Sequence, residues 1–230
     1  MKVAFLGTSD FVQVIRETID KNFILVEKVE DADLLVVASY GKILSKDIIN
    51  APKFGSVNVH PSLLPKYRGP SPIQAAILNG DKTSGITIIK MDDKMDHGPI
   101  IYQESLDLSD IDSFDTLSKK MFLRASEVLP QVLQDFIDGK LEAIEQDHTK
   151  ATFCPLLKRA DGYFDIDNPP TKEILDRMIR AYFPWPTAWT KWNNKIVKFL
   201  PNQMLQMEGK KPISFKDFLN GYPNFPIKDL

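Results

Sequence analysis

The sequence predicts an α/β protein with a doubly wound, mostly parallel sheet, followed by a small α+β module. First, short apolar runs alternate with amphipathic segments from Val3 to Leu106, a pattern typical of strands joined by helices. Second, Leu34–Ala38 is apolar throughout, which suits a parallel strand covered on both faces. Third, Asn168-Pro169-Pro170 interrupts the chain, and a helix and a hairpin are expected behind it as a separate module.

Each strand of the main sheet is expected where an apolar run ends in turn residues. The runs are Val3–Leu6, Phe23–Val29, Leu34–Ala38, Val57–His60, Gly85–Met91 and Ile100–Leu106. Helices are expected between them, where capping residues precede amphipathic segments. These are Thr8–Asp20, Ser45–Asn50, Pro72–Gly80 and Asp112–Asp138. Gly139 ends the last helix, and Pro130 is expected to kink it.

The second module begins with a helix expected over Lys172–Ala181. Two strands follow, Ala188–Trp192 and Ile196–Leu200, and the pair Asn193-Asn194 between them predicts a hairpin turn. Ser214–Asp217 resembles a capping box and predicts a last short helix. We therefore expect residues 1–150 to form the main domain and residues 151–230 to form a linker with a small module.

The composition is that of an ordinary globular chain, with 43% hydrophobic residues. No apolar run approaches the ~20 residues that span a membrane. The N-terminus MKVAFLGTSD lacks the long apolar region of a secretory signal, so a cytoplasmic location is expected. The single Cys154 cannot form an internal disulfide, which agrees with a reducing compartment. We expect it to be a buried or half-buried structural thiol.

The charge is unevenly divided along the chain. Residues 191–230 hold seven lysines against three acidic residues, a net charge of +4, which leaves −6 of the chain's total of −2 for residues 1–190. A basic tail on an acidic body is compatible with a phosphate-bearing partner. The plainer interpretation, a solvated lysine-rich surface, is favoured by composition alone.

Ligands of an open α/β sheet bind in the crevice beyond the carboxyl ends of its strands. Here that edge falls near Gly7, Ser39-Tyr40, His60 and the loop after Met91. The turn Gly7–Asp10 follows a strand, but no further glycine appears before Gly41. The glycines that admit a pyrophosphate are therefore missing, and a dinucleotide is not expected.

Three polar side chains of catalytic type are expected to meet at this edge. Asn58 and His60 alternate along one strand, so they share a face, and Pro61 ends the pairing directly after them. Asp96 lies in the loop that follows another expected strand. A lone histidine is more often structural, but an amide, an imidazole and a carboxylate at one edge indicate a possible catalytic set.

Other kinds of site have weaker support. The three histidines and one cysteine lack the spacing of metal ligands. Ser62 is not in a GxSxG turn, so a serine hydrolase is not indicated. Asp92, Asp93 and Asp96 could also be simple turn residues around Gly98.

Three runs resemble the formyltransferase domain that uses 10-formyltetrahydrofolate: Ala38–Leu44, NVHPSLLPKYRGPSPIQ at 58–74 and GITIIKMDDKMDHGPII at 85–101. Within that family the similarity is greatest to the methionyl-tRNA formyltransferases. Their later segments resemble Asp147–Thr152, Ile179–Pro186 and Glu208–Pro212. Six motifs in the family's order make this resemblance specific.

The resemblance implies a formyltransferase catalytic domain over residues 1–150, with Asn58, His60 and Asp96 at the family's catalytic positions. It also implies a folate pocket. The residues expected to line it are Ser39, Tyr40, Gly41, Ile43, Leu44, Ser62, Leu63, Leu64, Pro65, Met91, Asp92 and Met95. The implied donor is 10-formyltetrahydrofolate, the implied acceptor is initiator Met-tRNA, and neither a metal nor a membrane is involved. A monomer is expected.

The chemistry of the three residues fits such a transfer independently. Formyl transfer passes through a tetrahedral intermediate with an oxyanion, to which an Asn58 N–H can donate. His60 can accept the proton of the attacking amine or, when protonated, help to stabilise the oxyanion. A nearby Asp96 carboxylate would orient the ring and favour its charged form.

The chain departs from the family pattern in two places. Only a few residues separate the second strand from Leu34, where the family carries a longer region with a basic loop for tRNA. The chain also passes from Val197–Leu200 to Met204–Met207 with little between, whereas the family has a barrel-like domain there. We interpret this as an internally reduced C-terminal module.

Two other functions remain open from the sequence. One is an N-formyltransferase that acts on an amino sugar of a nucleotide carrier, with the same three catalytic residues. The other is a catalytically silent folate- or RNA-binding module, against which the intact Asn58, His60 and Asp96 argue.

Overall fold

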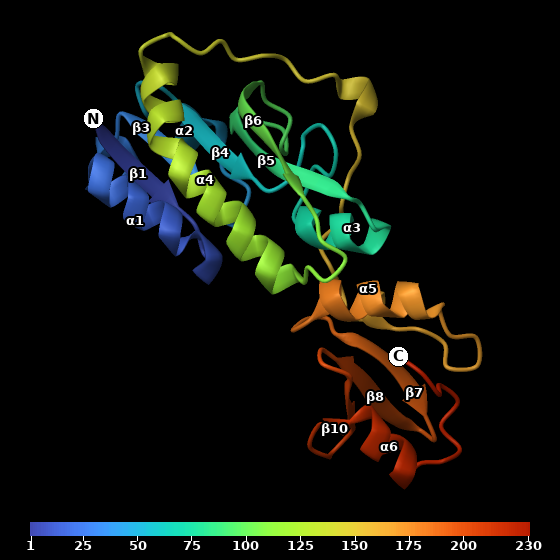
Figure 1. Cartoon of the computed structure of the whole chain (residues 1–230). Helices are drawn as coiled ribbons and strands as arrows, with labels where there is room; N and C mark the ends of the chain where they lie inside the picture. The colour runs from blue at the N-terminus through green and yellow to red at the C-terminus, as the bar shows by residue number, and fades with distance from the viewer. The chain divides into compact units, whose positions relative to one another are not determined.

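The computed structural model describes residues 1–230 of the chain. The chain divides into two compact units, which are interleaved in sequence (Figure 1). The first contains Met1–Ile73, Lys82–Ser109 and Asp115–Pro155, and the second contains Gln74–Asp81, Asp110–Phe114 and Leu156–Leu230.

The first unit is built on a six-stranded sheet with the strand order β2-β1-β3-β4-β5-β6. The strands are β1 Lys2–Leu6, β2 Ile24–Val26, β3 Leu34–Val37, β4 Ser56–His60, β5 Thr83–Lys90 and β6 Ile100–Asp107. Pairing is parallel from β2 through β4 and antiparallel for β4–β5 and β5–β6. The predicted mostly parallel α/β sheet is confirmed.

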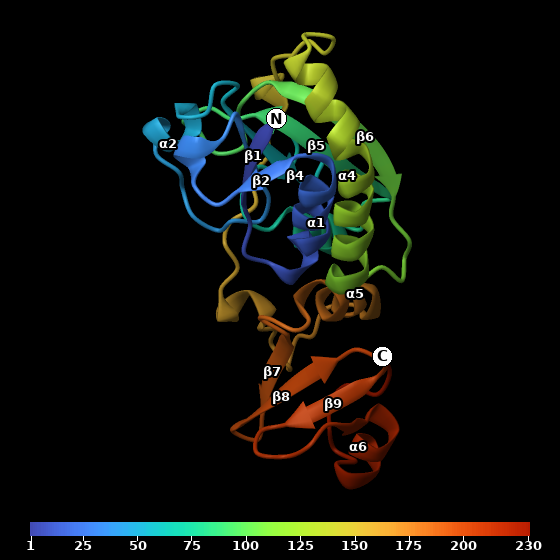
Figure 2. The ribbon, with the colours of Figure 1, turned by 90° about the vertical axis from the view of Figure 1, so that its left-hand side faces the viewer.

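Helices cover both faces of this sheet (Figures 1 and 2). Helices α1, Gln13–Asn22, and α4, Phe114–Ile137, lie on one face, and α2, Lys46–Asn50, lies on the other. Helix α4 buries its apolar stripe, as its helical spacing predicts, and continues through Pro130. Helix α3 spans Pro72–Asn79.

The edge strand β2 is shorter than the sequence suggests. Only Ile24–Val26 pairs with β1, and a single 3-10 turn follows at Val29–Asp31. An edge strand is paired on one side alone, so fewer contacts hold its ends than in the central β3, where all four residues are buried.

The second unit contains helix α5, Lys172–Tyr182, an antiparallel sheet and helix α6, Phe215–Gly221. The sheet has the order β10-β9-β8-β7, where β7 is Ala188–Trp192, β8 Lys195–Leu200, β9 Met204–Met207 and β10 Ile213–Ser214. Figure 2 shows β7, β8 and β9 side by side. The predicted hairpin turns at Asn193 and Asn194, both of which have positive φ. The core of the second unit is rich in aromatic side chains, including Phe164, Phe199, Phe218 and Phe225.

Candidate active site

Strand β4 brings Asn58 and His60 to one face of the sheet, at its carboxyl end. In the register with β5, Asn58 lies opposite Ile89 and His60 opposite Thr87. Strand β4 pairs with β3 on one side and with β5 on the other, so its position in the sheet is fixed. The period of two along a strand therefore places the amide and the imidazole next to each other.

Asp96 joins these two residues from the loop between β5 and β6. Its Oδ1 accepts a hydrogen bond of 3.1 Å from Asn58 Nδ2 and lies 3.5 Å from His60 Nδ1. Its Oδ2 accepts a 2.7 Å bond from the Gly69 backbone N–H. The three predicted catalytic side chains thus meet around one carboxylate, which is 12% exposed.

The His60 ring is held from both sides. Its Nε2 lies 2.9 Å from the Tyr67 carbonyl oxygen, so this nitrogen donates, and Nδ1 is left facing Asp96. The residue is 4% exposed. The burial and the two contacts fix the orientation of the ring.

Several of the residues expected to line a folate pocket pack against one apolar cluster of the sheet. Tyr40, Leu44 and Met91 pack against a buried apolar cluster of Ala4, Ala32, Leu35 and Val37. The loop after Met91 does not begin at the expected carboxyl edge, because β5 is antiparallel to β4 and the Met91 N–H donates to the carbonyl of Ser56, the first residue of β4, at 2.8 Å. Ser39 and Gly41 have positive φ and form the turn after β3, and the Ser39 carbonyl accepts from the Thr8 hydroxyl at 2.9 Å. Ile43 is 87% exposed.

The loop after β4 is tightly packed. Ser62 is fully buried, and its hydroxyl donates to the Lys66 carbonyl at 2.6 Å. This hydroxyl therefore stabilises the loop by a hydrogen bond within it. Leu64 is also buried, and its N–H donates to Thr87 Oγ1 at 3.2 Å. Leu63 lies against Gly85, where any Cβ would also meet the Glu104 carbonyl oxygen at 2.1 Å. Pro65 accepts a 3.2 Å bond from the Thr152 N–H.

The loop after β5 carries the remaining candidates, Asp92 and Met95. Asp92 Oδ2 lies 2.6 Å from His97 Nδ1, whereas Met95 is 53% exposed. The Lys46 ammonium lies 2.7 Å from Asp93 Oδ2. This contact lowers the pKa of the Asp93 carboxyl and raises that of Lys46, through their hydrogen bond first and their charges second.

Two buried polar residues beside Asp96 were not singled out from the sequence. Arg68 is 4% exposed and Gln146 is 5% exposed, and they are hydrogen-bonded to each other. Arg68 lies within the segment 58–74, but nothing in the sequence indicates that it is buried. Gln146 belongs to a segment without regular structure, so no periodicity marks it either.

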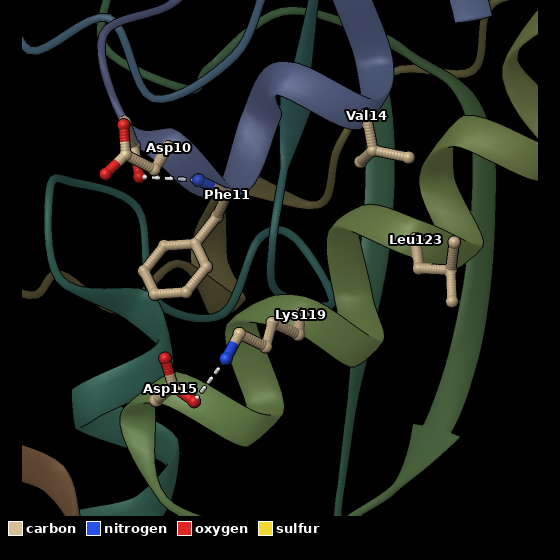
Figure 3. A pocket seen from close by; sticks show the side chains of 7 residues that line it. Asp10, Phe11, Val14, Asp115, Lys119 and Leu123 are labelled. Atoms are coloured by element: carbon tan, nitrogen blue, oxygen red, sulfur yellow. Dashed lines mark hydrogen bonds and ion pairs between the residues drawn. The ribbon is translucent and has the colours of Figure 1, made fainter. Parts of the chain in front are cut away.

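One pocket of the first unit lies beyond the end of β1 and contains none of the three catalytic candidates. It has a volume of about 590 Å³ and is lined by Ser9, Asp10, Phe11, Val14, Asp115, Lys119 and Leu123. Figure 3 shows Phe11, from the 3-10 turn Asp10–Val12, and Val14, from the start of α1, opposite the ion pair of Asp115 and Lys119 on α4.

No group of three or more potential ligand side chains in the chain could hold a metal ion. None of its helices has the length and apolar character that crossing a membrane requires.

Comparison with known families and relatives points to one family. A family model described as formyl transferase matches residues 14–133. A methionyl-tRNA formyltransferase of Roseiflexus sp. (strain RS-1) is 43% identical over 173 residues, covering 75% of the chain and 53% of the relative. One from Caldanaerobacter subterraneus subsp. tengcongensis is 34% identical over 220 residues, covering 92% and 71%. The chain spans about half the length of the first of these curated relatives.

Solved structures share the fold. A methionyl-tRNA formyltransferase from Clostridium thermocellum has a TM-score of 0.68 at 22% identity, covering 93% of this chain and 96% of that one. A sugar N-formyltransferase from Shewanella sp. FDAARGOS_354 has a TM-score of 0.71 at 19% identity, covering 92% and 99%. HypX from Aquifex aeolicus in complex with tetrahydrofolic acid has a TM-score of 0.73 at 13% identity, covering 97% and 47%.

Proposed function

Because this chain belongs to the formyl transferase family, we propose that it transfers a formyl group from 10-formyltetrahydrofolate to the amino group of methionine on initiator Met-tRNA. The observation that carries the proposal is the meeting of Asn58, His60 and Asp96 around one carboxylate. The names of the curated relatives support the acceptor, and a structural relative solved with tetrahydrofolic acid supports a folate donor.

The apolar surface formed by Tyr40, Leu44 and Met91 fits the flat ring of a folate. We propose that these residues, together with the turn Ser39–Gly41, hold the donor beside Asn58. 10-Formyltetrahydrofolate supplies the formyl group. The donor's site therefore lies beside Asn58, between the turn after β3 and the start of the loop after β5.

Asn58 stabilises the oxyanion that forms when an amine attacks the formyl carbon. Its Nδ2 has two N–H groups, of which one donates to Asp96 Oδ1. The other is left to donate to the developing oxygen anion. Because the first bond fixes the amide plane beforehand, little reorganisation is needed as the charge develops.

His60 and Asp96 accept the proton of the attacking amine and return it to the leaving nitrogen. As the new carbon–nitrogen bond forms, the amine loses a proton, which His60 Nδ1 and Asp96 Oδ1, 3.5 Å apart, can hold between them. When the bond from the formyl carbon to the folate nitrogen breaks, the same proton neutralises the leaving nitrogen. The proton balance closes without a covalent enzyme intermediate.

The test is transfer of labelled formyl from 10-formyltetrahydrofolate to charged initiator Met-tRNA, at low and moderate salt. We expect product on tRNA and less of it at the higher salt, because the acceptor carries many phosphates. Bound folate without any product on tRNA would contradict the proposal.

A second acceptor has one specific observation in its favour. The sugar N-formyltransferase that shares this fold is covered over 99% of its length, so that whole enzyme is matched. An amino sugar on a nucleotide carrier contacts few phosphates, so its formylation should depend only weakly on salt. The same assay with such acceptors in place of tRNA separates the two.

A further inference from the structure

Arg68 is a buried charge without a carboxylate partner. Its Nε and Nη2 donate to Gln146 Oε1 at 3.2 and 2.6 Å, and Nη2 also donates to His148 Nδ1 at 2.8 Å. A guanidinium that is 4% exposed is costly to bury unless its donors are used. Because a guanidinium can only donate, these bonds turn the carbonyl oxygen of Gln146 toward Arg68.

The amide nitrogen of Gln146 binds the loop that carries Asp96. With its oxygen held by Arg68, its Nε2 donates to the backbone carbonyl of Asp96 at 2.9 Å and to that of Gly98 at 2.7 Å. Both hydrogens of the amide are therefore used. The side chain is 5% exposed, so water does not compete for these bonds.

The loop needs this support because of its backbone. Asp96 has a φ of 49°, in the left-handed region that a residue with a side chain adopts at a cost. Two bonds fix its carboxylate, from Asn58 and from the Gly69 N–H, and Gln146 fixes its main chain from the other side. The position of the carboxylate is thus set by both ends of the residue.

The segment that supplies Gln146 is tied to the site at two further points. Ile144 pairs with Ile100 at the start of β6, through bonds of 2.7 and 2.8 Å. Farther along, Phe153 forms a bridge with Arg68, whose N–H donates to the Thr152 carbonyl at 2.8 Å. The segment 144–154 therefore joins the loop after β4 to the loop after β5, and Gln146 lies where the two meet.

We infer that Gln146, anchored by Arg68, is a positioning residue that sets the Asp96 carboxylate against Asn58 and His60. The expected effect on catalysis rests on the proposed formyl transfer. The structural claim, that Gln146 holds the loop of Asp96 in place, does not depend on it. A catalytic group displaced by about 1 Å can cost about 100-fold in rate. Gln146 touches no reacting atom, so its effect must pass through Asp96.

The test variant is Gln146→Glu. The new carboxylate has the same length and still accepts from Arg68, so the buried charge keeps a partner. It has no N–H for the carbonyls of Asp96 and Gly98, and its second oxygen repels them, so the loop loses its support while Arg68 keeps an acceptor. The matched control is Gln134→Glu, the same change at an exposed position of α4 in the same unit, where Nε2 donates to Asp138.

Two measurements are made on both variants and on the unaltered chain. The first is kcat and KM for formyl transfer to Met-tRNA. We expect kcat of Gln146→Glu to fall about 10- to 100-fold, with little change in KM for Met-tRNA or for the folate donor. All of these constants should be unaffected in Gln134→Glu. The second is hydrogen exchange of the amides of residues 91–98, which should quicken in Gln146→Glu only, whatever reaction the chain catalyses.

An unchanged kcat in a folded Gln146→Glu chain would overturn the inference, as would a loss confined to KM. If that variant does not fold, Gln146→Met, of similar length and uncharged, takes its place. It removes the acceptor of Arg68 as well as both donors to the loop, so the same loss of kcat and the same faster exchange are expected, together with a lower stability. Failure of both variants to fold would make Gln146 a stability residue and also contradict the inference. Absence of formyl transfer by the unaltered chain would instead overturn the proposed function. The exchange measurement would still test whether Gln146 holds residues 91–98 in place.

Discussion

At the scale of single residues, the site depends on one carboxylate with three donors or basic atoms around it. Asp96 accepts from Asn58 and Gly69 and faces His60. The alternation of Asn58 and His60 in an apolar strand predicts this site, because strand period and strand end are both visible in sequence. For Asp96, the sequence indicates only a loop after another strand, and the family resemblance implies its catalytic position. The contacts of its carboxylate depend on the path of that loop, which has no local periodicity.

Arg68 and Gln146 show what the sequence leaves open. Their burial arises from the segment 144–154, which has no regular secondary structure beyond a short 3-10 turn at His148–Lys150. Charged and amide side chains are exposed in most positions. Only the tertiary path of that segment places the two residues behind the site.

Asn58→Asp tests the amide at nearly constant shape. It removes both N–H donors and sets a second carboxylate where Nδ2 now lies 3.1 Å from Asp96. Loss of one oxyanion donor costs about 100- to 1000-fold in kcat, and we expect at least that. The measurement is kcat on Met-tRNA, with Asn50→Asp, at an exposed position of α2, as the control. An Asn58→Asp chain that keeps a tenth of the activity would contradict the role given to the amide.

Cys154 should be chemically inert in the folded chain. Burial raises the pKa of its thiol above the ordinary value of 9.0, so the folded state favours the protonated form. The stabilising effect of that protonation is complete below the unfolded value and is lost as pH rises through the folded value. At about pH 9 the thiolate is the reactive species. We therefore expect alkylation by iodoacetamide to be at least ~10-fold slower in the native chain than in concentrated urea, and equal rates would contradict the burial.

At the scale of elements, the central strands are predictable and the edges are not. Strand β3 is a continuous apolar run, and the buried middle of β5 is mostly apolar, with Ile86, Ile88 and Ile89 beside Thr87, so both are visible without tertiary context. The end of β2 and the strands β9 and β10 depend on pairing. The turn between β8 and β9 uses Asn202 and Gln203 with positive φ, a pair that lacks the usual glycine of such turns.

Two glycines of the second unit give a matched test of its packing. A Cβ at Gly162 would lie 2.0 Å from the Thr187 carbonyl oxygen, whereas Gly221, in helix α6, has open space around it. Gly162→Ala should lower the free energy of unfolding by about 1–3 kcal/mol, and Gly221→Ala should raise it by about 0.5–1 kcal/mol. All three tryptophans lie in this unit, so urea unfolding followed by their fluorescence reports on it alone. Equal effects of the two changes would contradict the packing.

At the scale of the whole molecule, the chain joins an acidic body to a lysine-rich end. The sequence places a single boundary near residue 150, whereas the compact units interleave, because 74–81 and 110–114 belong with the C-terminal residues. Contacts between segments distant in sequence decide such a division, and no local signal reports them. The uneven division of charge, in contrast, can be counted directly along the sequence.

The lysine-rich end should contribute to binding of a tRNA acceptor. Lys211 is exposed and lines a pocket of about 480 Å³ with Lys210 and Tyr222. We expect Lys211→Gln to raise KM for Met-tRNA and to flatten the dependence of log KM on log salt by about one charge, with kcat unchanged. Lys53→Gln, at an exposed position of the first unit, is the control. The same KM and slope in Lys211→Gln as in the control would remove this end from the tRNA surface.

The most direct test of the account is the single-turnover rate of formyl transfer to Met-tRNA by the unaltered chain and by His60→Asn, with circular dichroism to confirm the fold of both. A positioned acid–base group contributes about 100- to 10,000-fold, and we predict a loss in that range for the variant. A folded His60→Asn chain as fast as the unaltered one would contradict the account, because the group that faces Asp96 would then take no part in the transfer.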